Sequence, residues 1–443
     1  MTNQPSTAVG PHASRRDFLK TSGAAIAGSA LAAAPNIARS AHPGGFDTLK
    51  LGLVGCGGRG TGAATDALGG DKNLILTAMG DVFPDAIERS IAQLQRDGAI
   101  REKLDVAPDN RFVGLDAYQK VINSGVDVVL LCTPPGFRPK HLAAAVAANK
   151  HVFCEKPMAT DGPGVRSVLE TAAKAKEKNL ALVAGFCWRY DYARREIFQR
   201  IHDGELGSIR TIYATYYTGP VKPMQPPDAR KPDCTDVEWQ IRNWYNFTWL
   251  SGDGLVEQAV HSVDKIAWAM KDMPPAKAVA VGGRQLPNYE GNIFDHFEIN
   301  YEWSDGTRAF MGCRQIPACW NQNADYIIGT KATAQLGVRL GRRTVEIVGE
   351  NPWMYAGPAN NMYQTEHAEL YASIRAGKPI NDGVWMSTST MMAIMGRMAA
   401  YTGQEITWEM ALNSQEHLVP DPLDWNMKLD LPKMAMPGLT KFV

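Results

Sequence analysis

The residues LKLGLVGCGGRG, at 49–60, constrain the fold more than any other stretch of the chain. An apolar run typical of a buried strand ends in Gly55, Gly57 and Gly60, and a helical pattern follows directly. Glycines at this spacing permit a tight turn, a close approach of the backbone to a pyrophosphate, and close packing of the helix on the strand. The positive N-terminal end of the helix attracts phosphate. In this context the motif predicts a dinucleotide-binding site.

An acidic residue stands where such a site needs one. Asp81 ends the next apolar strand, 21 residues after Gly60, where its carboxylate would accept hydrogen bonds from ribose hydroxyls. The same carboxylate would repel a 2′-phosphate, and the following Val82 and Phe83 supply no cation to hold one. The sequence therefore favours NAD over NADP.

Strands and helices alternate from Leu49 to about residue 185, a pattern typical of a parallel sheet. After Asp203, longer alternating runs such as SIRTIYATYYTG and FDHFEINYEW indicate a mostly antiparallel open sheet. The predicted fold class is α/β, with an N-terminal Rossmann domain and a C-terminal α/β domain. We expect a signal region at 1–41, the Rossmann domain at 48–170 and the C-terminal domain at 171–443.

Composition narrows the classes of partner. The 443 residues contain 46 lysines and arginines and 46 aspartates and glutamates, so no net charge favours nucleic acid or an acidic membrane surface. Seven cysteines form no CxxC pair. His296 and Glu298 share one face of a predicted strand, but no third ligand accompanies them, so we predict no metal site.

The N-terminal segment predicts export. Arg15 and Arg16 precede Phe18, Leu19, Lys20 and a short run of alanine, glycine and leucine, which matches a twin-arginine signal. That run is too short to span a membrane, and no other segment approaches the ~20 apolar residues that a span needs. We therefore expect an exported, periplasmic protein with no membrane contact beyond its signal.

Five motifs in a fixed order resemble the Gfo/Idh/MocA oxidoreductase family. They are GCGGRG, Thr133 with Pro134, CEKP at 154–157, GFCWRYD at 185–191, and a predicted helix that carries Glu257, His261 and Asp264. The resemblance covers nearly the whole chain after residue 48. It implies an NAD(P)-dependent enzyme that acts on a sugar or polyol, and a homo-oligomer formed through the second domain's open sheet.

The resemblance also implies the site residues. The expected cofactor-binding residues are Gly55, Cys56, Gly57, Gly58, Arg59, Gly60, Asp81, Thr133, Pro134, Glu155 and Lys156. The expected catalytic residues are Lys156, His261 and Glu257. The family has an aspartate at the position of Glu257, so this chain departs from the family pattern there.

Chemistry suggests a role for each catalytic residue. Oxidation of a secondary alcohol requires a base for the hydroxyl proton, and His261 is expected to accept it, with an ordinary pKa near 6.5. Lys156 would stabilise the developing alkoxide. Glu257, one turn before His261, is expected to fix the tautomer of the imidazole and favour its protonated form.

Further residues are candidates for the substrate. Arg189 and Asp264 could bind substrate hydroxyls, although a structural salt bridge explains them equally well. Between Gly219 and Leu250 a segment rich in proline and tryptophan is predicted to be a long ordered loop. Four of its aromatic residues could stack on a sugar or belong to the core: Trp239, Trp244, Tyr245 and Trp249.

Export restricts how the cofactor can be used, because free nicotinamide cofactor is not expected outside the cytoplasm. We therefore expect a tightly bound NAD that is reduced by one sugar and reoxidised in the same site. One alternative is redox-neutral cleavage of a glycoside through transient oxidation. The other is a secreted sugar-binding protein without catalysis.

Overall fold

The computed structural model describes residues 47–339 and 342–443. The predicted signal region, 1–41, lies outside the described residues. Among the described helices, none combines the length and the apolar character that a membrane span requires.

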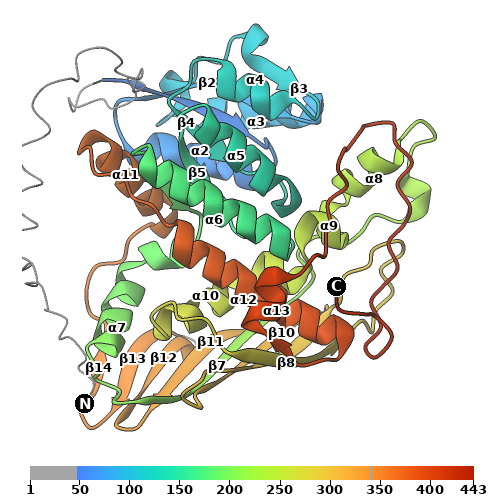
Figure 1. Ribbon diagram of the computed structural model, residues 1–443. Helices are drawn as coiled ribbons and strands as arrows, with labels where there is room; N and C mark the ends of the chain where they lie inside the picture. The colour runs from blue at the N-terminus through green and yellow to red at the C-terminus, as the bar shows by residue number, and fades with distance from the viewer. Residues whose placement is uncertain (1–46, 340–341) are drawn as a thin grey trace, which may run out of the picture. The chain divides into compact units, whose positions relative to one another are not determined.

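The glycine-rich motif lies in a parallel sheet (Figure 1), which has six strands in the described part of the chain, in the order β3-β2-β1-β4-β5-β6. The strands are β1 (Leu49–Val54), β2 (Leu74–Asp81), β3 (Arg111–Val113), β4 (Val128–Leu131), β5 (His151–Cys154) and β6 (Leu182–Ala184). All four residues of β4 and of β5 are buried, because helices cover both faces of the sheet. This order is that of a Rossmann fold, so the predicted fold class is confirmed.

Helices join the strands of this layer. They are α2 (Gly58–Gly70), α3 (Pro84–Arg96), α4 (Ala117–Asn123), α5 (Arg138–Ala147) and α6 (Gly162–Glu177). A helix from far along the chain, α11 (Met362–Arg375), packs against α2. The predicted boundary between residues 170 and 171 remains a prediction, and the parallel sheet itself extends to β6.

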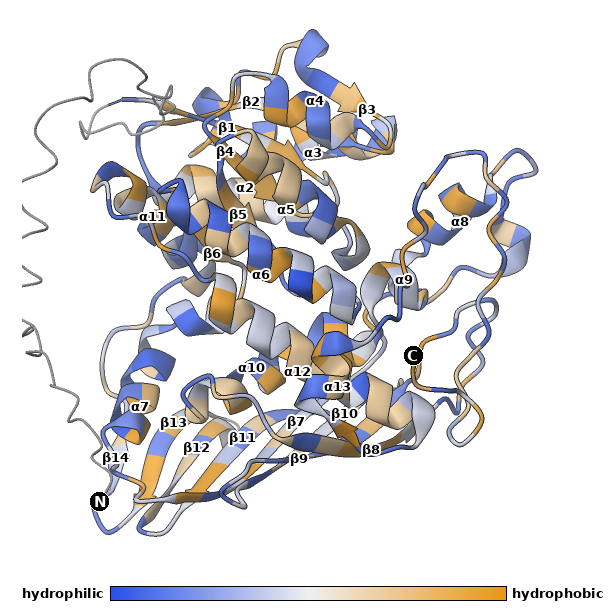
Figure 2. Ribbon diagram, viewed as in Figure 1, coloured by the Kyte–Doolittle hydropathy of each residue, from blue (hydrophilic) through white to orange (hydrophobic). Residues whose placement is uncertain are grey.

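The second sheet has nine strands in the described part of the chain, in the order β14-β13-β12-β11-β7-β10-β9-β8-β15. The strands are β7 (Ile209–Thr218), β8 (Lys277–Gly283), β9 (His296–Glu302), β10 (Arg308–Gln315), β11 (Gln322–Gly329), β12 (Ala332–Arg339), β13 (Arg342–Gly349), β14 (Trp353–Met354) and β15 (Ile406–Thr407). The pair of β7 and β10 is parallel, whereas the other pairs are antiparallel. Hydrophobic and hydrophilic residues alternate along its strands (Figure 2), so one face is buried. The predicted mostly antiparallel open sheet is confirmed.

Two buried helices connect the layers. Both α10 (Val260–Ala269) and α12 (Gly383–Thr402) contact the large sheet, and α12 also contacts α6 of the Rossmann layer. One continuous cluster of buried side chains runs from the parallel sheet through α12 to the large sheet. The two layers therefore share a hydrophobic core.

The segment between Gly219 and Leu250 is the predicted long loop only in its first half, which is irregular up to residue 235 apart from one turn at Pro227–Ala229. It contains α8 (Asp236–Arg242) and leads into α9 (Thr248–Ser251). The Thr235 hydroxyl accepts a hydrogen bond from the Glu238 N–H at 3.1 Å, and Asp236 and Glu238 favour the helix start electrostatically. This Thr-x-x-Glu capping motif is present in the sequence, but the prolines of the segment favoured the prediction of a loop.

Candidate active site

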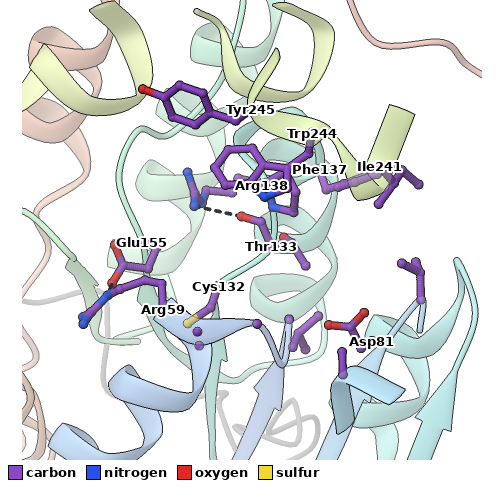
Figure 3. Close-up of a pocket in the computed structure, with 18 of the residues that line it drawn as sticks. Arg59, Asp81, Cys132, Thr133, Phe137, Arg138, Glu155, Ile241, Trp244 and Tyr245 are labelled. Carbon is purple, nitrogen blue, oxygen red and sulfur yellow. Dashed lines mark hydrogen bonds and ion pairs between the residues drawn. The ribbon is translucent and has the colours of Figure 1, made fainter. Parts of the chain in front are cut away.

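A cavity of about 790 Å³ lies at the carboxyl ends of β1, β2, β4 and β5. Open α/β sheets bind their ligands at this edge. Figure 3 shows Arg59 and Glu155 at one end of the lining, Asp81 at the other, and Trp244 and Tyr245 on the side opposite the strands. The cavity also brings together Lys156, Glu257 and His261.

The three motif glycines have the geometry that a pyrophosphate site requires. Gly55 has a φ of +93°, and a Cβ on it would lie 2.7 Å from the carbonyl carbon of Cys132. A Cβ on Gly60 would lie 1.8 Å from the Gly55 carbonyl oxygen. By contrast, a Cβ on Gly57 or Gly58 would meet no heavy atom within 4 Å, so the N-terminal end of α2 is open to a ligand. These residues therefore fit a dinucleotide.

Substitution of Gly60 tests this packing. Because the Cβ of Gly60→Ala would overlap the Gly55 backbone, we expect α2 to shift from β1 and the free energy of unfolding to fall by about 1–3 kcal/mol or more. Gly62→Ala in the same helix is the matched control, because its Cβ would make an ordinary van der Waals contact, 3.7 Å from Arg59 Nη1. Alanine there should stabilise by up to about 1 kcal/mol. Urea denaturation of both variants measures the difference, and equal stability would contradict the packing role.

Asp81 is held in place by backbone groups. Its Oδ2 accepts a hydrogen bond from the Cys56 N–H at 2.7 Å, and its Oδ1 accepts one from the Phe83 N–H at 3.0 Å. Burial raises the pKa of Asp81, while these N–H donors act to lower it. Each carboxylate oxygen keeps a lone pair for a ribose hydroxyl. The Cys56 side chain is buried and does not line the cavity. Cys56 contributes to the site through its backbone N–H, which donates to Asp81.

Arg59 joins the glycine loop to two other elements. Its guanidinium pairs with Glu155, which follows β5, and lies 3.6 Å from Glu366 Oε1 of α11. It also stacks over the Tyr363 ring at 4.9 Å. Burial, and secondly the charge of Glu155, raise the pKa of Glu366 well above its usual range. Sequence reasoning found Arg59 and Glu155 but missed α11, because nothing local marks a distant helix as part of the site.

Arg138 fixes the turns that carry Thr133 and Lys156. Its Nη2 donates to the Thr133 carbonyl at 2.8 Å, as Figure 3 shows, and its Nη1 donates to the Pro157 carbonyl at 2.5 Å. His141 Nδ1 lies 3.3 Å from Thr133 Oγ1. Burial lowers the pKa of His141 to about 3. Thr133 and Pro134 line the cavity as predicted, whereas Arg138 and His141 were missed.

Lys156 and Glu257 form a buried ion pair across the two layers. Lys156 Nζ lies 2.9 Å from Glu257 Oε1 and also donates to the Glu257 backbone carbonyl. The prediction that Glu257 orients His261 is therefore corrected. The Glu257 oxygen that makes a side-chain hydrogen bond, Oε1, accepts it from Lys156 and not from His261. Glu257 Oε2 is buried and has no hydrogen-bond partner among the described residues.

His261 enters the cavity from a helix with a local irregularity. Residues Leu255–Ala259 form a π turn before α10, which changes the rotation between Glu257 and His261. The ring lies 5.0 Å from that of Trp188, and its buried Nδ1 has no partner among the described residues. Burial, then the charges of Lys156 and Lys265, lower the pKa of His261 well below its usual range. The prediction that Glu257 favours the protonated form of His261 is thus wrong, because the surroundings of the ring favour its neutral form.

Known families and proteins match this chain over much of its length. The family model described as the oxidoreductase family with an NAD-binding Rossmann fold matches residues 49–186, and a model of the twin-arginine signal matches residues 12–32. An inositol 2-dehydrogenase of Rhizobium meliloti is 27% identical over 330 residues, 74% of this chain and 86% of the relative. Another, of Cereibacter sphaeroides, is 34% identical over 271 residues, 60% of this chain and 68% of the relative. The chain belongs to the Gfo/Idh/MocA oxidoreductase family.

A solved structure of similar fold is that of the aldose-aldose oxidoreductase from Caulobacter crescentus, complexed with glycerol. It has a TM-score of 0.61 and 18% identity, over 81% of this chain and 99% of the other. As a Gfo/Idh/MocA protein the present chain is an oxidoreductase with an NAD-binding Rossmann layer, and it carries a twin-arginine signal sequence.

Two residues suggested for the substrate do not reach the cavity of this Gfo/Idh/MocA protein. Arg189 Nη2 lies 2.8 Å from Asp264 Oδ1 and 2.6 Å from Asp272 Oδ1, and Ser389 donates to Asp264 at 2.7 Å. Neither Arg189 nor Asp264 lines the cavity. Arg189 and Asp264 therefore form a structural salt bridge. The prediction that they bind substrate hydroxyls is corrected.

The aromatic residues of 219–250 divide into two groups. Trp239 and Trp249 are buried, and their indole N–H groups donate to Glu290 and Gln240. Trp244 and Tyr245 line the cavity instead. Sequence analysis could not separate them, because both pairs lie at similar positions in short helices.

Proposed function

We propose that this protein is an NAD-dependent oxidoreductase of a secondary hydroxyl on a sugar or polyol, exported to the periplasm with its cofactor bound. The observation that carries the proposal is one continuous cavity lined by the open glycine turn, Lys156 and His261. The names of the relatives, inositol 2-dehydrogenase and aldose-aldose oxidoreductase, support the substrate class.

The proposed roles follow from the charges at the site. A nicotinamide bound in this cavity would supply the hydride acceptor for oxidation of a carbinol carbon and, once reduced, the hydride donor for reduction of a carbonyl carbon. Neutral His261 accepts the hydroxyl proton in the first half-reaction and returns it in the second. Lys156, held by Glu257, stabilises negative charge on the substrate oxygen.

Retention of the cofactor is supported by a lid made of two segments. The segment 219–250 and the tail from Leu418 to Leu429 pack into one hydrophobic cluster with Phe83, which lines the cavity beside Asp81. The Trp425 ring lies 5.9 Å from that of Phe83, edge to face, and the Arg242 guanidinium lies 3.9 Å above the Phe83 ring. Release of a dinucleotide would require this lid to move, which favours reduction and reoxidation in place.

Cofactor retention is tested on the purified protein. We expect NAD to copurify and to be freed by denaturation, and the bound cofactor to be reduced by a sugar and reoxidised by a second carbonyl compound without leaving. Absorbance at the nicotinamide band and enzymatic assay of the supernatant measure both steps. Protein that contains no nicotinamide would contradict the proposal, and aglycone released from a chromogenic glycoside without net oxidation would favour the cleavage alternative.

A lid variant provides the contrast in the same experiment. Trp425→Ala removes an edge-to-face pair worth about 0.5–1.5 kcal/mol, so NAD release should accelerate by up to about tenfold. Trp320→Ala is a matched control, because Trp320 is 68% exposed and lies outside the cavity lining.

We also propose a homo-oligomer formed through the open face of the large sheet. Exposed apolar side chains stand on several of its strands: Tyr213, Val279, Val281, Ile328 and Val348. Exposed apolar surface of this kind favours a protein partner.

A further inference from the structure

One cation that lines the cavity has no counterion. Lys222, in the segment that covers the cofactor site, is half-buried, and its ammonium makes no hydrogen bond or ion pair with any residue of 47–339 or 342–443. Within that part of the chain, the one interaction of its Nζ is with the Trp244 ring, whose centroid is 5.7 Å away. Burial lowers the pKa of Lys222, and no carboxylate opposes that shift.

Of the other lysine and arginine side chains that line the cavity, all but one pair with a carboxylate. Four of them have a carboxylate partner: Arg59 with Glu155, Arg89 with Asp85, Lys156 with Glu257, and Arg242 with Glu238. Arg138 is the exception, since its guanidinium donates to backbone carbonyls. Lys222 and Arg138 have no carboxylate partner, and Asp81 is the lining carboxylate that pairs with backbone N–H groups rather than a cation, so among the described residues of the lining positive charge is in excess.

A partly desolvated ammonium that faces a cavity and has no carboxylate beside it attracts an anionic group of a ligand. We propose that Lys222 binds an oxyanion of a ligand in this cavity. Two ligands could supply it: a sugar that carries a carboxylate, or the pyrophosphate of the dinucleotide. Trp244, which packs beside the ammonium, offers a ring face to the same ligand. The inference rests on the proposed function for the identity of the two ligands.

Lys222→Met tests the contact, because it keeps the length of the side chain and removes its charge. Lys222→Arg should retain binding, and Lys231→Met, at an exposed lysine of the same segment, is the matched control. The protein is studied with its cofactor bound. One arm measures the rate of NAD release, and the other measures binding of D-glucuronate, D-galacturonate and D-gluconate against D-glucose and D-galactose by tryptophan fluorescence.

Each outcome decides the inference. If the substrate supplies the oxyanion, Lys222→Met weakens binding of the sugar acids roughly ten- to hundredfold and leaves the neutral sugars unchanged. If the cofactor supplies it, the same variant accelerates NAD release by a similar factor, with sugar binding unchanged. The inference is overturned if Lys222→Met changes neither NAD release nor sugar-acid binding. The same holds if no sugar acid binds and NAD release is unchanged.

These arms are distinct from the test of the proposed function. Binding and release are measured without turnover, so a protein that holds NAD but oxidises no sugar still reports on Lys222. A protein without NAD would contradict the proposed function, and the sugar-acid arm would still test the ammonium.

Discussion

Lys156→Met is expected to lower kcat/KM for sugar oxidation by about 10²- to 10³-fold, the usual effect of removing one donor that stabilises an oxyanion. The variant removes the ammonium that lies 2.9 Å from Glu257 Oε1 and leaves that carboxylate buried without its partner. Steady-state kinetics of NADH formation, or single-turnover reduction of bound NAD, measures the loss. Activity close to that of the wild type would remove Lys156 from the proposed mechanism.

Loss of stability has to be separated from loss of catalysis. Breaking a buried ion pair by removing one partner costs about 3–5 kcal/mol, so Lys156→Met alone should also be destabilised. The double variant Lys156→Met with Glu257→Gln removes both charges and should recover most of that stability while it stays inactive. A double variant that regained activity would show that the single variant failed through misfolding.

His261→Gln is expected to lower kcat/KM by about 10²- to 10⁴-fold, because it removes the proposed proton acceptor and keeps a polar side chain of similar size. Binding of NAD should change little, since His261 is not expected to contact the dinucleotide's phosphates. Comparison of kcat/KM with cofactor content measures the two effects separately. Equal loss of cofactor and activity would place His261 in cofactor binding instead.

The pH dependence gives a second measurement on the same residue. Because the pKa of His261 is well below its usual range, wild-type kcat/KM should not fall through pH 6.5, where an ordinary histidine base would titrate. The unfolded chain takes up a proton on this residue below about pH 6.5 and the folded chain does not, so the wild type should lose stability there as the pH falls. His261→Gln should lose less stability over the same range.

The sequence predicted the parts of the site whose chemistry is local. The spacing of Gly55, Gly57 and Gly60 after an apolar strand depends on backbone geometry within a few residues, and the structure shows the tight turn and close packing that it implies. Asp81 follows from the same unit. The parallel sheet was predictable for the same reason, since strand and helix alternate in order along the chain.

Contacts between distant segments were not predictable in this way. Glu257, His261 and Asp264 were predicted on one regular helix, but the π turn at Leu255–Ala259 breaks its periodicity. The partner of Glu257 is Lys156, 101 residues earlier in the chain. Lys222 carries no sequence signal at all, because its importance comes from the absence of a neighbouring carboxylate.

The hydrophobic core that runs through α6 and α12 limits how a ligand can enter. Separation of the two layers as rigid bodies would expose that core to water, at about 25 cal/mol for each Å² of apolar surface. Hinge opening between the halves is therefore too costly to serve each catalytic cycle. Entry and exit of a ligand should instead depend on small local displacements around the mouth of the cavity, which keeps the protein's working motions short in range.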